Sequence, residues 1–237
     1  MSGPGRTRRW WRWLLIGLVL LVVLVVGGAA IYAKSQPTAA PLTLPAAAAR
    51  PPAGPADGNW DAAAGSVAGF RIRESALGFG DDVSGRTTAV SGTAVIAEGR
   101  VARAAFRIDL TAITVGGKPK PQLATSLDTA AHPDATITLA GPARLPAGFG
   151  GGRTVSAALP GWLTLHGVTR PITITVSARR DGTAIEAAGS LPVASGRWGI
   201  TLPAGFGFLG GLSSQATAEF LLILHRRGDG GHGLSVP

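Results

Sequence analysis

Alternating apolar and polar residues on both sides of a short glycine turn form the clearest pattern in the chain, at positions 161–176. The apolar positions that share one face are Leu163, Leu165, Ile172, Ile174 and Val176. Polar residues, most of them threonines, occupy the alternate positions. Alternation with a period of two around a glycine turn predicts a β-hairpin with one apolar face and one polar face.

The same alternation recurs between about residue 60 and residue 227. It predicts strands at 66–74, 87–97, 100–110, 135–140, 153–166, 170–180, 183–191 and 215–227. Glu98-Gly99 and Asp181-Gly182 are typical hairpin turns between neighbouring strands. We therefore expect about eight short strands and no helix in this domain, arranged as a sandwich or a barrel.

Two longer segments, 111–132 and 191–214, break the strand pattern and are rich in Gly and Pro. Long irregular segments inside a compact domain are more often functional than accidental. We expect them to form the mouth of a binding site.

The N-terminus carries a run from Trp13 to Tyr32 that contains no charged residue. Four arginines precede this run, and about 20 residues of helix span a bilayer. Positive charge before the span predicts a cytoplasmic segment at 1–12, one transmembrane signal anchor at 13–33 and an extracytoplasmic C-terminal part. The protein is then expected in the cell membrane. The alternative is a cleaved signal peptide, although such apolar stretches are usually shorter.

The chain after the anchor divides by composition. Residues 34–58 are rich in Pro and Ala, which predicts an extended linker that holds the domain away from the membrane. Residues 59–227 form the folded domain. Residues 228–237 are a Gly-rich tail that we expect to be disordered.

Charge and composition exclude several classes of function. The formal net charge is +9, but the arginines are scattered, so we expect no nucleic-acid partner. The chain has no cysteine, which excludes thiol catalysis and thiolate metal sites. His132, His166 and His225 lack the spacing of metal ligands. No nucleophile elbow or phosphate-binding loop occurs, so we expect neither a metal site nor an enzyme.

Four motifs in order resemble the YceI-like, polyisoprenoid-binding, lipocalin-like domain family. They are Trp60-Asp61 followed by Ser66-Val67, the segment 127–137, the hairpin 161–171 (Gly-Trp-Leu-Thr-Leu-His-Gly-Val-Thr-Arg-Pro) and the segment 197–200 (Arg-Trp-Gly-Ile). The resemblance implies an all-β fold, an extended eight-stranded antiparallel lipocalin-like barrel with an apolar lumen. The family often carries an Arg-Asp pair where this chain has Lys118-Pro119-Lys120-Pro121.

Apolar-face residues and two tryptophans are the candidate ligand-binding residues. They are Phe70, Ile72, Phe106, Ile108, Leu110, Ile137, Leu139, Trp162, Leu163, Leu165, Ile172, Ile174, Trp198 and Leu222. The alternative for each aliphatic residue and Phe is ordinary core packing, because the pattern does not reveal the width of the space behind it. Trp162 and Trp198 either contact the ligand or plug one end of the barrel.

These observations predict a membrane-anchored extracytoplasmic lipid-binding protein. The resemblance implies a long-chain isoprenoid or a similar amphiphile, such as a fatty lipid, as ligand, and no other cofactor is expected. Two alternatives stay open. One is an accessory domain that works with a membrane redox protein or a lipid-modifying system. The other is a filled structural barrel without a ligand.

Overall fold

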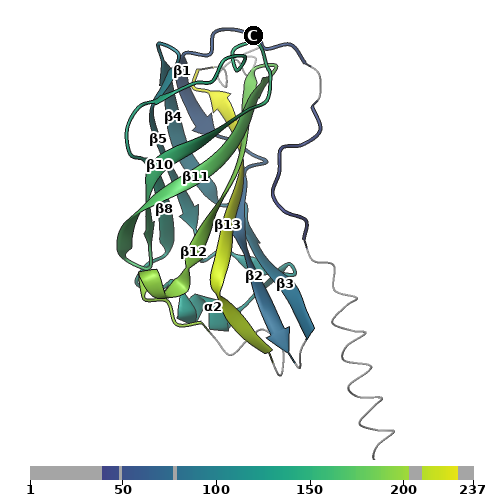
Figure 1. The fold of residues 1–237 in the computed structure, drawn as a ribbon, viewed down its shortest axis with the longest axis vertical. Helices are drawn as coiled ribbons and strands as arrows, with labels where there is room; N and C mark the ends of the chain where they lie inside the picture. Colours follow the sequence, from purple (N-terminus) through teal and green to yellow (C-terminus); the bar gives the residue numbers. More distant parts are fainter. Residues whose placement is uncertain (1–38, 48–49, 77–78, 203–209, 229–237) are drawn as a thin grey trace, which may run out of the picture. The chain divides into compact units, whose positions relative to one another are not determined.

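The computed structural model describes residues 39–47, 50–76, 79–202 and 210–228, drawn in colour in Figure 1. These residues belong to one compact unit that begins at Ala39. The anchor predicted at 13–33 and most of the tail predicted at 228–237 lie outside the described residues. No helix within the described part of the chain is long and apolar enough to cross a bilayer.

The described strands form a closed antiparallel barrel of eight strands, because β1 pairs with both β4 and β13. In spatial order the barrel strands are β1 (Gly58–Ala62), β4 (Val90–Ala97), β5 (Arg100–Asp109), β8 (Asp134–Leu139), β10 (Val155–Leu165), β11 (Val168–Asp181), β12 (Ala184–Ala194) and β13 (Gly210–Arg226). The prediction of an all-β, eight-stranded antiparallel barrel is confirmed.

β13 is longer than the other strands, so its two halves pair with different neighbours. Its C-terminal end pairs with β1, and its N-terminal part pairs with β2 (Val67–Ala76). β2 continues into β3 (Phe79–Thr87), which pairs with a small ribbon of β6 (Thr114–Val115) and β7 (Lys118–Pro119). A two-residue strand, β9 (Ala143–Arg144), pairs with β5. The extension formed by β2 and β3 lies at the same end of the barrel as α2 in Figure 1.

Two-residue turns with positive φ join several strands. Glu98 and Gly99 have φ of 53° and 67°, and His166 and Gly167 have φ of 51° and 72°. Turns with positive φ at both positions match the twist of the flanking strands, which explains the hairpins β4–β5 and β10–β11. The third hairpin differs from its prediction by one residue. Asp181 pairs with Ala184, so the β11–β12 turn is formed by Gly182 and Thr183.

All eight predicted strands are present with small shifts at their ends. Several elements of the described chain were not among the predicted strands, and β3 and α2 are the longest of them. β3 contains Gly80, Asp81 and Asp82 at its start, so it lacks an apolar run. The helix α2 (Pro121–Ser126) contradicts the expectation of no helix. It begins with proline and buries only Leu123, so six residues show no helical periodicity.

Glycine is required where β2 and β3 approach each other. A Cβ atom on Gly69 would lie 1.9 Å from the carbonyl oxygen of Gly85, and one on Gly85 would lie 2.3 Å from the ring of Phe70. Any larger residue at either position would push the two strands apart.

Candidate lipid-binding lumen

The barrel encloses an apolar cavity that extends along its length. The volume of the cavity is about 300 Å³. Its lining includes Leu123 and Leu127 near α2, and Leu145 and Phe149 in the loop before β10. Side chains from the barrel strands and β2 line the space between them. Among the described residues of the lining, only Arg144, Ser195 and Glu219 are polar.

Period-two alternation on the strands creates this lining. On β10, Ala157, Leu159, Leu163 and Leu165 turn to the cavity, whereas Ala158 between them is exposed. The apolar side chains form three buried clusters, which are centred on Trp60, on Leu123 and on Trp198. The sheet therefore supplies an apolar inner surface without any polar cradle.

Eleven of the fourteen candidate residues line the cavity. They are Phe70, Ile72, Phe106, Ile108, Leu110, Ile137, Leu139, Leu163, Leu165, Ile174 and Leu222. Each stands at an inward position of a strand or directly after one. The structure therefore brings these residues together around one space.

The other three candidates do not line the cavity. Trp162 is 46% exposed and lies outside the barrel, where it pairs with Thr138 and Pro171. Alternation along β10 places Trp162 on the outer face and its neighbour Leu163 on the inner face. The assignment of Trp162 to the lumen or to a plug is therefore wrong. Trp198 is buried in the 3-10 helix η1 (Ser195–Trp198) and packs in the cluster of Leu163 and Leu191. Ile172 is half-buried against the same cluster.

The two irregular segments predicted to form a mouth lie at the α2 end of the barrel (Figure 1). They contain α2 and η1, and 203–209 lie outside the described residues. His166 in the β10–β11 turn lies 3.0 Å from the carbonyl oxygen of Trp198 through Nδ1, so Nδ1–H is the donor. The ring of His132 contacts that of His166 edge-on, with centroids 5.6 Å apart. These contacts join both irregular segments to the hairpin tip.

The β1 end of the barrel is filled by side chains. Trp60 and Phe149 are almost completely buried there, and the indole nitrogen of Trp60 donates to the carbonyl oxygen of Ala56 at 2.9 Å. Arg180 is buried beside them and donates to the carbonyl oxygen of Gly150. Side chains therefore fill the β1 end, and at the α2 end Leu123 and Trp198 are buried as well.

Comparison with known proteins decides the family. The YceI-like domain family matches residues 60–218, which include most of the barrel strands. The chain belongs to the YceI-like domain family. No curated protein matches the chain.

Two solved structures resemble the YceI-like barrel. One is a polyisoprenoid binding domain from Saccharophagus degradans implicated in plant cell wall breakdown, with a TM-score of 0.55 and 18% identity over 71% of this chain and 98% of that one. The other is Burkholderia cenocepacia BcnA, with a TM-score of 0.48 and 18% identity over 65% of this chain and 95% of that one. At this identity the first likeness shows the fold alone, and a membrane redox partner stays a prediction.

Residues 39–57, which we call the strap, precede the part that matches the family. The described residues of the strap before Gly58 carry no helix or strand, as expected for a Pro/Ala-rich segment. They nevertheless lie against the outside of the YceI-like barrel, which differs from the prediction of a linker free of the domain. The reason is a set of arginines on the barrel that donate to carbonyl oxygens of the strap.

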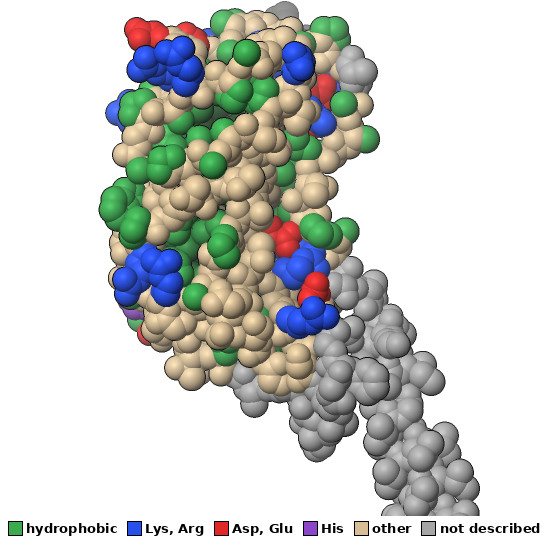
Figure 2. Space-filling model, viewed as in Figure 1, with side chains coloured by type: hydrophobic (Ala, Val, Ile, Leu, Met, Phe, Trp, Pro, Cys, Tyr) green, Lys and Arg blue, Asp and Glu red, His purple; other side chains and the backbone are tan. Residues whose placement is uncertain are grey.

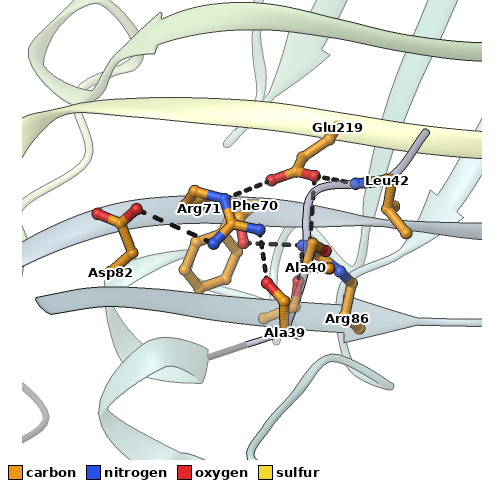
Figure 3. Close-up of polar contacts among 9 residues, drawn as sticks. Ala39, Ala40, Leu42, Phe70, Arg71, Asp82, Arg86 and Glu219 are labelled. Atoms are coloured by element: carbon orange, nitrogen blue, oxygen red, sulfur yellow. Dashed lines mark hydrogen bonds and ion pairs between the residues drawn. The ribbon is translucent and has the colours of Figure 1, made fainter. Parts of the chain in front are cut away.

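The first contact lies over β2, β3 and β13 (Figure 3). Glu219 accepts a hydrogen bond from the backbone nitrogen of Leu42 at 2.6 Å. The same carboxylate accepts from Arg71 at 3.1 Å and from Arg86 at 3.2 Å. Arg71 and Arg86 also donate to the strap carbonyl oxygens, at residues 39 and 40 respectively. Burial lowers the pKa of Arg86 from the usual arginine value.

The second contact lies over β11 and β12. Arg179, paired with Glu186, donates to the carbonyl oxygen of Pro45 at 2.8 Å. At the β1 end of the barrel, Arg180 donates to the carbonyl oxygens of residues 53 and 54. Arg50 binds Asp181 with two hydrogen bonds of 3.1 and 3.0 Å, and this contact lowers the pKa of Asp181. The strap is thus held at both ends by charged groups of the barrel.

Sequence reasoning assigned these charges to a solvated surface. On the face shown in Figure 2, Lys and Arg occur in separate groups instead of one continuous band. Arg179 and Glu186 lie opposite each other across the β11–β12 turn. The predicted turn at Asp181-Gly182 pairs Arg179 with Ala184 instead, so the prediction missed both this cross-strand pair and its burial under the strap.

Proposed function

We propose that this protein binds the apolar tail of a long-chain isoprenoid, or of a similar amphiphile, in the lumen of its barrel. The observation that supports this proposal most strongly is the apolar cavity that extends between the two ends of the barrel. Such a surface binds by the area removed from water, at about 25 cal/mol per Å². It does not require a fixed pattern of polar groups on the ligand.

The size of the cavity supports a chain ligand over a filled barrel. A cavity measured in the same way needs at least about 10 Å³ to hold one water molecule. The cavity of about 300 Å³ is roughly thirty times larger, so it has room for an apolar chain of many carbons.

The position of the two irregular segments supports one orientation of the ligand. The tail points toward the β1 end, which Trp60, Phe149 and Arg180 fill. The polar head then lies at the α2 end, beside the segments 111–132 and 191–214, where Lys118 and Arg197 are exposed. These cations favour an anionic head group or an anionic membrane surface.

We also propose that the barrel is extracytoplasmic and anchored in the cell membrane by residues 13–33. The support is the uncharged run from Trp13 to Tyr32, with four arginines before it. In that setting the barrel would carry, store or present a lipid near the bilayer. Protease added outside intact cells should digest a tag placed at the C-terminus and spare a tag at the N-terminus.

A chain-length series tests the binding proposal. The protein without residues 1–38 retains the compact unit that begins at Ala39. We would displace a fluorescent fatty acid from it with prenyl alcohols of about 10 to about 40 carbons, since each added carbon buries more area. We expect affinity to rise with length and to level off once the lumen is filled. No displacement at any length, or equal displacement at all lengths, would contradict the proposal.

A further inference from the structure

The docked strap determines where the chain leaves the barrel. At Ala39 and Ala40 the backbone is held by Arg71 of β2 and Arg86 of β3, as Figure 3 shows. The side chain of Glu219 beneath them is only 4% exposed. Hydrogen bonds to charged groups of low exposure are among the stronger ones in proteins. The preceding chain therefore starts from the outer wall of β2 and β3.

The length of chain before this point limits the distance to the uncharged run. The first charged residue after that run is Lys34, and Ala39 follows Ala33 by six residues. Six residues reach at most about 22 Å when fully extended. A linker that was free as far as Trp60 would reach roughly 85–95 Å. Docking of the strap thus shortens the tether about fourfold.

We propose that the outer wall of β2 and β3 faces a lipid surface, and that the docked strap holds the contact at Ala39 within about 22 Å of that surface. The proposal rests on the proposed function, because it takes residues 13–33 as membrane-embedded. β2 and β3 extend toward the α2 end of the barrel (Figure 1). The short tether therefore keeps the mouth of the lumen near the bilayer, where an isoprenoid ligand enters and leaves.

Energy transfer to labelled lipid measures this distance. The chain has no cysteine, so Ser75→Cys on β2 gives one exposed site for a donor dye. The full chain is reconstituted in phosphatidylcholine vesicles that contain an acceptor-labelled lipid. Flotation of the vesicles first establishes that the protein is embedded. We expect efficient transfer from the dye at position 75.

Two insertions of the same flexible Gly/Ser linker of about 20 residues provide the decisive comparison. One is placed between Thr38 and Ala39, before the strap, and adds about 25 Å of root-mean-square reach. The matched control is placed between Ala47 and Ala48, after the first strap contact. If the strap is docked, only the first insertion lengthens the tether. We expect transfer to fall about twofold or more for the first insertion and to stay unchanged for the second.

Equal loss of transfer for both insertions would overturn the proposal, because the strap would then be a free linker. Failure of the full chain to float with the vesicles would overturn it too, and would remove the membrane anchor from the proposed function. Lipid binding in the lumen is judged separately, by the displacement series. Both insertions leave the lumen residues in place, so unchanged displacement also shows that the variants are folded.

Discussion

The lumen and the outer wall under the strap lie on opposite faces of the same strands. On β13, Ala218, Phe220 and Leu222 line the cavity, whereas the carboxylate of Glu219 between them binds the strap. On β11, Val176 and Ala178 face inward, whereas Arg179 is buried beneath residues 45 and 46. A shift of one residue along a strand thus changes an apolar environment into one with buried charges.

The two faces would recognise an extended chain by different physics. The lumen offers apolar area, so a bound tail can slide or differ in length without losing a specific partner. The outer wall offers directed hydrogen bonds to particular backbone atoms of the strap, and these fix its register. The charged side chains of the outer wall would be costly to bury without their hydrogen-bond partners, so the strap and the wall stabilise each other.

The largest expected effect is the loss of stability caused by a substitution in the outer wall. Glu219→Gln removes the counter-charge of the partly buried Arg86 and leaves Arg71 with the exposed Asp82 at 4.0 Å, and we expect the free energy of unfolding to fall by about 3 kcal/mol. Urea denaturation measures this value. Glu98→Gln, at an exposed turn, is the matched control and should change it by less than about 0.5 kcal/mol. Equal effects of both substitutions would mean that the strap does not bury this carboxylate.

The next largest expected effect is a loss of ligand affinity caused by a substitution in the lumen. Ala157→Phe places a large ring in the cavity, whereas Ala158→Phe on the same strand places it outside. We expect the first variant to raise the Kd for a prenyl alcohol about tenfold or more, or about 1.4 kcal/mol, and the second to leave it unchanged. Fluorescent fatty acid displacement measures both. If the two rings weaken binding equally, the ligand does not occupy the lumen.

A smaller effect is expected where the strap meets the β11–β12 turn. Arg50→Ala removes the contact with Asp181, but Arg50 is itself exposed, so global stability should hardly change. The amides of Ala53 and Gly182 should exchange hydrogen about threefold or more faster, because their bonds depend on this contact. Arg103→Ala, at an exposed position of β5, is the control. Unchanged exchange in both variants would show that Arg50 does not hold the strap.

The smallest expected effect is a loss of amide protection near the β11–β12 turn at acid pH. The contact with Arg50 lowers the pKa of Asp181 below that of an unfolded aspartate, which is about 3.9. Its stabilising contribution is therefore fully present above about pH 3.9 and is lost as pH falls through the lower, folded value. Protection of the Gly182 amide should decline only in that acid range, and Asp181→Asn should remove this step. A decline between about pH 6 and pH 5 would point to a different group.

The barrel and most of its lining could be predicted from the sequence because a period of two determines which face each strand residue occupies. Leu163 and Leu165 followed from that rule alone. The assignment of Trp162 to the lumen did not follow from the rule. It was based on the residue type, although alternation placed Trp162 on the other face of the strand from Leu163. The helix α2 has one buried residue, Leu123, so it offers no period to detect.

The docked strap could not be predicted from its own residues. Its contacts near Leu42 and Pro45 use backbone atoms, which every sequence has, so Pro and Ala there give no sign of them. The informative residues are on the barrel, where Glu219 interrupts an apolar run at an outward position. Its burial depends on a segment about 180 positions earlier in the chain, and local patterns do not reveal such a contact.

Native mass spectrometry of the full-length protein, released gently from membranes, tests lipid binding in the lumen most directly. We predict a complex with one lipid per chain, whose organic extract contains a long apolar chain such as an isoprenoid. Ala157→Phe should reduce the bound fraction, and Ala158→Phe should not. A protein that emerges empty, and stays empty after incubation with prenyl alcohols, would contradict the account.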